Sequence, residues 1–133
     1  MILRVMIVDN DYSARRDIER KVRWVENDFE LVGEANDGEE ALALIPYVTP
    51  HVILTEIRMP NMDGITFIET AKKRWPKIKY IIISNYDHFD FLRQAVKVGA
   101  YDYLLKPVKE EDIHQALMRA KTEIETGVRK FFL

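Results

Sequence analysis

The sequence predicts an α/β protein with a doubly wound, five-stranded parallel sheet, strand order 2-1-3-4-5 and helices on both faces. Two observations predict this architecture. Along the 133 residues, five short apolar segments alternate with five segments whose apolar residues recur at helical spacing. The segment "KYIIIS" at 79–84 is almost wholly apolar, which is typical of a strand buried on both faces. The length predicts one domain, because two separate cores would each be small.

The first two strands each lead towards a helix through a turn that contains aspartate. "LRVMIV" at 3–8 is the first strand, and it enters the turn "DND". A helix over about 13–27 is predicted from the spacing of Ala14, Ile18, Val22 and Val25. "ELVGEA" at 30–35 is the second strand, and "DGEEALALI" begins the second helix at Asp37 and Gly38.

The third strand, "HVILT" at 51–55, ends at Glu56 and is followed by the turn "MPNMDG". The next helix runs to Trp75, where Pro76 stops it, and its apolar positions are Ile65, Ile68 and Ala71. This unit therefore delivers a carboxylate into a tight turn.

The fourth strand at 79–84 leads to a helix that ends at Gly99 and is marked by Phe89, Leu92 and Val96. "YDYLL" at 101–105 is the fifth strand. The last helix has an apolar stripe made by Ile113, Ala116, Leu117, Ala120 and Ile124.

Polar side chains follow four of the predicted strands. They are Asp9, Asn10 and Asp11, then Glu56, Ser84 and Lys106. Sites in doubly wound sheets lie beyond the carboxyl ends of the strands, so we expect these residues to converge. Carboxylates suit Mg²⁺, a serine can hydrogen-bond a phosphoryl oxygen, and a lysine can neutralise its charge. The set predicts a site that transfers or holds a phosphoryl group.

Composition excludes several other classes of protein. There is no cysteine, which rules out disulfides and thiolate chemistry and fits a cytoplasmic location. The net charge of −2, with basic residues scattered among acids, argues against this segment binding nucleic acid by itself. No apolar run reaches the roughly 20 residues of a membrane span.

The stretches "MIVDND", "ILTEIRMPNMDG" and "IIISNYDHFDFLRQAVKVGAYDYLLKP" closely resemble the receiver domain of bacterial two-component response regulators. The resemblance is strongest to receivers of AraC-type transcriptional regulators. It implies a flavodoxin-like (βα)5 fold, a histidine kinase partner and DNA binding only through a domain outside this chain. We expect residues 1–126 to form the receiver domain and 127–133 to begin a linker or tail.

The resemblance also implies a role for each matching residue. In the family, an aspartate at the position of Glu56 accepts the phosphoryl group. Matched by position, the Mg²⁺ ligands are Asp9, Asn10, Glu56 and the backbone carbonyl of Arg58. The remaining matches form the phosphoryl-binding and switch set, which contains Ser84, Tyr103, Lys106 and Pro107.

Three departures from the family pattern lie at this site. Glu56 replaces the acceptor aspartate, Asn10 replaces a metal-binding acid, and Asn85 follows Ser84 where a small residue is usual. The extra methylene moves the carboxylate by roughly 1.5 Å, and a misplacement of about 1 Å can lower a transfer rate about 10²-fold. We therefore expect weak or absent phosphorylation, weakened Mg²⁺ binding, and a Glu56 carboxylate that partly imitates an aspartyl phosphate.

Two alternatives compete with this interpretation. Asp9 and Asp11 resemble the opening motif of haloacid-dehalogenase-type phosphatases, although the later acidic motif of those enzymes is poorly supplied; we expect no enzyme. The second alternative is a phosphorylation-independent interaction or homodimerisation module. By resemblance, its surface lies on the fourth helix, fifth strand and fifth helix, with candidate residues Phe91, Lys97, Asp102, Tyr103, Glu111 and Arg119.

Overall fold

The computed structural model describes residues 1–127 and contains one sheet of five parallel strands in the order β2-β1-β3-β4-β5. The strands are β1 (Leu3–Val8), β2 (Phe29–Ala35), β3 (Val52–Thr55), β4 (Lys79–Ser84) and β5 (Asp102–Leu105). The helices are α1 (Tyr12–Lys21), α2 (Gly38–Val48), α3 (Gly64–Arg74), α4 (Phe89–Val98) and α5 (Glu110–Thr126). The predicted fold class and strand order are confirmed.

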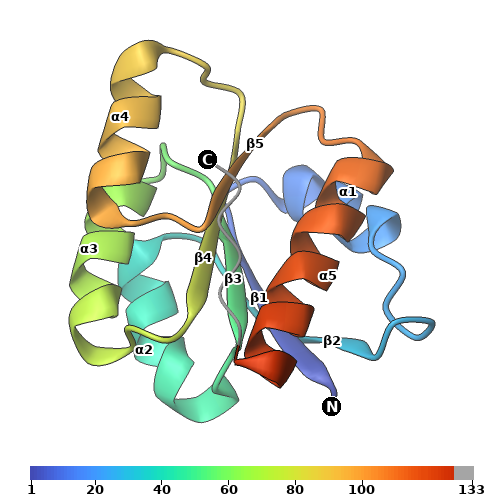
Figure 1. Cartoon of the computed structure of the whole chain (residues 1–133). Helices are drawn as coiled ribbons and strands as arrows, with labels where there is room; N and C mark the ends of the chain where they lie inside the picture. Colours follow the sequence, from blue (N-terminus) through green and yellow to red (C-terminus); the bar gives the residue numbers. More distant parts are fainter. Residues whose placement is uncertain (128–133) are drawn as a thin grey trace.

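Helices cover both faces of the sheet, α1 and α5 on one and α2, α3 and α4 on the other (Figure 1). Side chains of β1 alternate between the two cores, as the period of a strand requires. Val5 and Ile7 pack towards α1 and α5, whereas Met6 and Val8 pack towards α2, α3 and α4. Two apolar cores therefore hold the central strands, and the carboxyl edge of the sheet is left for polar side chains.

The first helix is shorter than the predicted 13–27. It ends at Lys21, and the chain is extended at Val22, the C-cap residue. The indole of Trp24 donates a hydrogen bond to the carbonyl of Glu19 at 2.8 Å, which turns the chain back towards β2. Val25, whose spacing suggested a longer helix, is 91% exposed. Val22 continues the apolar period because it is buried in the core from the extended C-cap position, just after the helix has ended.

The fourth helix lies where it was predicted, but the residues that predicted it face outwards. Phe89, Leu92 and Val96 are exposed, whereas Phe91 and Ala95 pack against the sheet. No helix within residues 1–127 is long and apolar enough to cross a membrane. The tail predicted at 127–133 lies outside the described residues apart from Gly127.

Candidate functional site

The carboxyl edge of the sheet brings together four of the predicted site residues. Asp9 follows β1, Glu56 follows β3, Ser84 ends β4 and Lys106 follows β5. Three of them are almost fully buried, and Lys106 enters from the rim with its side chain 16% exposed. The carboxyl ends of parallel strands lie at the same edge of a sheet, so the topology alone places these side chains together.

Glu56 lies at the centre of this group and is 5% exposed. Its Oε1 accepts hydrogen bonds from the Ser84 hydroxyl at 2.7 Å and from the backbone N–H of Ile57 at 3.0 Å. Its Oε2 lies 2.9 Å from Lys106 Nζ, as an ion pair. The ammonium of Lys106 is therefore the group that neutralises the charge of this buried oxygen.

Lys106 bridges the two buried carboxylates. Its Nζ lies 2.7 Å from Asp9 Oδ2 as well as 2.9 Å from Glu56 Oε2. Burial acts to lower the pKa of Lys106, but the hydrogen bonds and charges of Asp9 and Glu56 outweigh it and raise the pKa above its usual value. The side chain therefore stays protonated at neutral pH and is shared between two acids.

Tyr86 links the serine to the tyrosine of the predicted switch. The backbone N–H of Tyr86 donates to Ser84 Oγ at 3.1 Å, and the carbonyl of Tyr86 accepts a hydrogen bond from the Tyr103 hydroxyl. Burial is the main cause that raises the pKa of Tyr103, so its hydroxyl remains a donor. Glu56, Ser84, Tyr86 and Tyr103 thus form one continuous chain of hydrogen bonds.

A glycine closes the turn after Glu56. A Cβ on Gly64 would lie 2.0 Å from the carbonyl oxygen of Glu56, so only glycine fits there. The Gly64 N–H donates to the Ile57 carbonyl at 2.7 Å, and Asp63 caps α3 through the N–H of Thr66 at 2.8 Å. The Asp-Gly signal in the sequence therefore fixes the backbone that carries Glu56.

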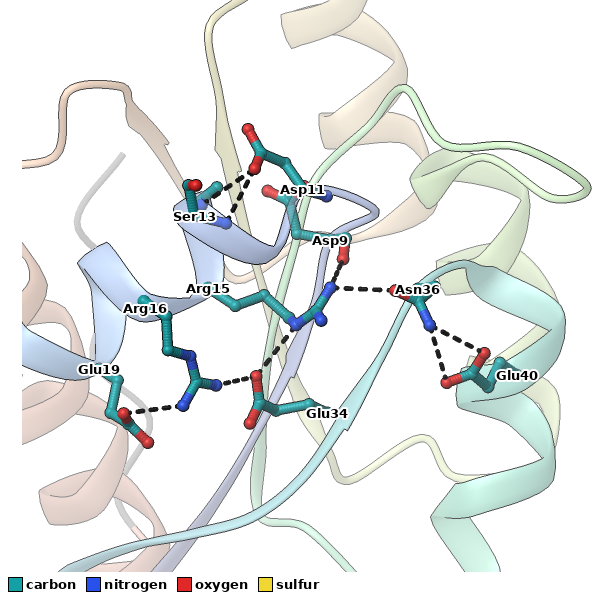
Figure 2. Close-up of polar contacts among 10 residues, drawn as sticks. Asp9, Asp11, Ser13, Arg15, Arg16, Glu19, Glu34, Asn36 and Glu40 are labelled. Atoms are coloured by element: carbon teal, nitrogen blue, oxygen red, sulfur yellow. Dashed lines mark hydrogen bonds and ion pairs between the residues drawn. The ribbon is translucent and has the colours of Figure 1, made fainter.

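Figure 2 shows a guanidinium clamp on the acidic turn that was not identified from the sequence. Arg15 donates to the carbonyl of Asp9, to Glu34 at 3.0 Å and to Asn36 Oδ1 at 3.1 Å. Arg16 pairs with the same Glu34 carboxylate. Burial raises the pKa of Glu34, but its hydrogen bonds to both arginines outweigh this and hold the pKa below its usual value. The clamp ties the ends of β1 and β2 together.

The acidic turn itself divides between the interior and the surface. Asp9 points into the site, whereas Asn10 is exposed and Asp11 caps α1 by accepting from the N–H of Ser13 at 2.9 Å. Asp11 is therefore a helix cap, with no place beside Glu56. Asn85 is exposed and borders a cavity of about 250 Å³ beside Lys106 and Pro107. The Lys106–Pro107 peptide bond is cis.

The donor set does not fit a well-charged Mg²⁺ site. Within residues 1–127 no three acidic or histidine side chains converge as metal ligands. The two buried carboxylates already share Lys106, and the position of the third acid holds the neutral amide of Asn10. A hard divalent cation prefers several anionic oxygens, so this site has lost part of that charge.

Of the six residues predicted for an output surface, four are engaged in the fold. Phe91 and Tyr103 pack partly buried against the core, and Asp102 pairs with Arg119. Lys97 and Glu111 are exposed. The exposed apolar side chains of this region were missed as surface residues, because helical spacing does not tell which of two apolar stripes faces the sheet.

Curated relatives of the chain are bacterial regulators. It is 28% identical over 122 residues to the uncharacterized transcriptional regulatory protein YesN of Bacillus subtilis, covering 92% of this chain and 33% of YesN. It is 36% identical over 118 residues to the positive alginate biosynthesis regulatory protein of Pseudomonas aeruginosa, covering 89% of this chain and 47% of that protein. The chain thus spans a third to about half the length of these relatives.

Solved structures agree with this relationship. The receiver domain of AraT, a response regulator from Geobacillus stearothermophilus, superposes with a TM-score of 0.87 at 33% identity, covering 96% of this chain and 98% of that one. A two-component transcriptional regulator AraC from Clostridium phytofermentans superposes with a TM-score of 0.79 at 30% identity, covering 94% and 97%. A model of the response regulator receiver domain matches residues 5–118. The chain therefore belongs to the response regulator receiver domain family, a non-enzymatic class of signalling domain.

Proposed function

We propose that this receiver is held in one signalling conformation by Glu56 and is weakly phosphorylated or not phosphorylated at all. The observation that carries the proposal is the pair of contacts made by one carboxylate. Glu56 Oε1 binds Ser84 at 2.7 Å while Oε2 lies 2.9 Å from Lys106. A hydroxyl and an ammonium are the partners that a phosphoryl group on a shorter aspartate would seek.

The longer side chain explains how one carboxylate can reach both partners. A glutamate extends roughly 1.5 Å further than an aspartate, one carbon–carbon bond. It carries a single charge and two oxygens, whereas a phosphoryl group carries up to two charges and three acceptor oxygens. The imitation of an aspartyl phosphate is therefore partial, and it is permanent.

The same contacts oppose phosphorylation of Glu56. Oε1 already accepts two hydrogen bonds, and Oε2 faces the ammonium of Lys106. Attack on a phosphoryl donor would have to break one of these contacts from a buried position. Weak Mg²⁺ binding, caused by the neutral Asn10, would lower the rate further because the metal neutralises charge during transfer.

The wider role follows from the relatives. We propose that a cytoplasmic transcriptional regulator contains this domain and that DNA binding belongs to a segment outside this chain. A histidine kinase is the partner of such regulators, and its influence here would be reduced by Glu56. A phosphorylation-independent homodimer through α4, β5 and α5 is the second candidate. It is favoured by the exposed apolar side chains Phe89, Leu92, Val96 and Leu105.

Incubation with acetyl phosphate and Mg²⁺, followed by intact-protein mass spectrometry, tests the first proposal. The native chain should gain little or no phosphoryl mass. Glu56→Asp should gain it slowly, and Glu56→Asp with Asn10→Asp should gain it faster, because acceptor length and metal charge are both restored. Rapid stoichiometric modification of the native chain at Glu56 would overturn the proposal.

Dimerisation is tested separately by light scattering of the native chain and of Val96→Lys. Dimers that are lost on substitution and unaffected by beryllofluoride support the interaction module. A monomer at all concentrations would exclude that surface as a self-association site.

A further inference from the structure

The side chain of Arg58 joins three segments around the site. Its guanidinium lies 4.7 Å from the ring centre of Tyr86 and 5.4 Å from that of Phe91. Arg58 belongs to the loop after β3, Tyr86 to the loop after β4, and Phe91 to the first turn of α4. The two rings are themselves 5.5 Å apart. A single cation therefore holds the acceptor loop, the switch loop and the start of a helix together.

Tyr86 connects this aromatic cluster to the hydrogen bonds of the site. Its ring faces Arg58, while its backbone contacts Ser84 Oγ and the hydroxyl of Tyr103. One residue thus carries both the ring that contacts Arg58 and the backbone groups that contact Ser84 and Tyr103.

Helix α4 has two apolar stripes. Phe91, Ala95 and Val98 face the sheet, and Phe89, Leu92 and Val96 face outwards. Both sets follow helical spacing, and the outward set contains the greater apolar volume because an alanine lies in the inward one. Burial of apolar surface alone would therefore not select the observed face.

The start of α4 also lacks the usual local support. Its N-cap residue, His88, makes no side-chain capping hydrogen bond, whereas α1, α2 and α3 are all capped by aspartates. Capping by such side chains typically contributes about 1 kcal/mol. The first turn of α4 consequently depends on tertiary contacts, and the contact of Phe91 with Arg58 is one of them.

We propose that Arg58 is a positioning residue that selects which face of α4 packs on the sheet. Its guanidinium holds Tyr86 and Phe91, and so keeps Phe89, Leu92 and Val96 on the outside. The inference deepens the proposed function, since the outward stripe matters for signalling only if this receiver has an output surface. The orientation of α4 can nevertheless be measured without any assumption about phosphorylation.

Thiol labelling tests this directly, because the native chain contains no cysteine. Ala95→Cys places a thiol on the inward face of α4, at a position 3% exposed. Adding Arg58→Ala should raise its labelling rate by Ellman's reagent about fivefold to tenfold, as expected for loss of a cation shared by two rings. Val96→Cys, at a position 71% exposed, should label rapidly with or without Arg58.

Three controls separate local repositioning from general loosening. Ala71→Cys on α3 is fully buried, and its labelling should change less than about twofold when Arg58 is removed. Arg74→Ala removes a guanidinium that lies 4.4 Å from the Trp75 ring, and it should leave the labelling rate of Ala95→Cys unchanged. Arg58→Lys keeps the charge and should restore part of the protection.

Two results would overturn the inference. One is an unchanged labelling rate in Ala95→Cys after removal of Arg58. The other is an equal increase in Ala71→Cys, which would mean that Arg58 only stabilises the whole fold. Rapid phosphorylation of the native chain would contradict the proposed function and leave this labelling result standing, so the two failures are distinguishable.

Discussion

The two ends of the sheet carry buried polar clusters of different construction. At the amino end, the carboxylate of Glu123 on α5 accepts from the Tyr101 hydroxyl at 2.6 Å and lies 3.3 Å from Lys79. At the carboxyl end, Asp9 and Glu56 share Lys106. A lysine and a tyrosine hydroxyl thus serve one acid at the amino end, whereas one lysine serves two acids at the carboxyl end. A second buried carboxylate without its own cation lowers stability. Its presence therefore indicates that the carboxyl end is the functional end of the sheet.

Removal of the shared lysine should have the largest effect. Lys106→Met would leave two buried carboxylates without a cation, and we expect a loss of about 3 to 5 kcal/mol in unfolding free energy. Lys79→Met should lose less, about 1 to 3 kcal/mol, because Tyr101 still donates to Glu123. Urea denaturation of both variants measures the difference. Equal losses would mean that the two clusters are equivalent.

Two tyrosines near β5 make hydrogen bonds at opposite ends of the sheet. Burial first, and then the hydrogen bond to Glu123, raise the pKa of Tyr101 to about 12. Tyr101→Phe should destabilise the fold by about 1.5 to 3 kcal/mol, because a buried carboxylate loses its donor. Tyr103→Phe removes only a bond to a carbonyl and should lose about 1 kcal/mol. If thermal unfolding shows that Tyr103→Phe is more destabilising than Tyr101→Phe, the hydrogen bond to the Glu123 carboxylate is not the stronger of the two.

The smallest expected effect concerns pH at the amino end. His51 Nδ1 accepts a hydrogen bond from the Arg4 N–H at 2.9 Å, and burial, together with the charge of Arg4, lowers the pKa of His51 below its ordinary 6.5. As the pH falls, His51 is therefore protonated near pH 6.5 in the unfolded chain but only at a lower pH in the folded chain. His51 contributes its full stability above that pH and loses it as the pH falls towards the folded pKa.

His51→Asn is the matched control for this pH effect, since an amide oxygen can accept the same N–H without titrating. Unfolding free energies measured between about pH 7.5 and 5 should fall more steeply for the native chain than for the variant. Parallel curves would show that His51 does not cause the slope.

The sequence predicted the parts of the molecule that depend on strand order. Glu56, Ser84 and Lys106 could be placed together because each follows a strand of a parallel sheet, and the turn at Gly64 could be read from its Asp-Gly signal. The end of α1 could not be predicted, since Val22 and Val25 keep the helical spacing although the chain is extended at Val22 and Val25 is exposed. The orientation of α4 was equally hidden, because its two apolar stripes have the same spacing.

The contacts that arginine side chains make around the site could not be predicted from the sequence. Arg15 meets Glu34 and the carbonyl of Asp9 only after α1 has packed beside β2. Arg58 meets Tyr86 through two loops whose conformations no periodic pattern specifies. The partners of a long cationic side chain depend on the tertiary structure, so the residue type alone does not indicate which groups it will contact.

In the proposed function, Glu56 fixes the chain of contacts through Ser84, Tyr86 and Tyr103. Amide resonances of these residues, recorded by ¹H–¹⁵N NMR before and after addition of beryllofluoride with Mg²⁺, test it most directly. The resonances of the native chain should not shift, whereas those of Glu56→Asp should shift clearly, because the shorter side chain leaves room for the fluoride group. Native resonances that move as far as those of Glu56→Asp would contradict it.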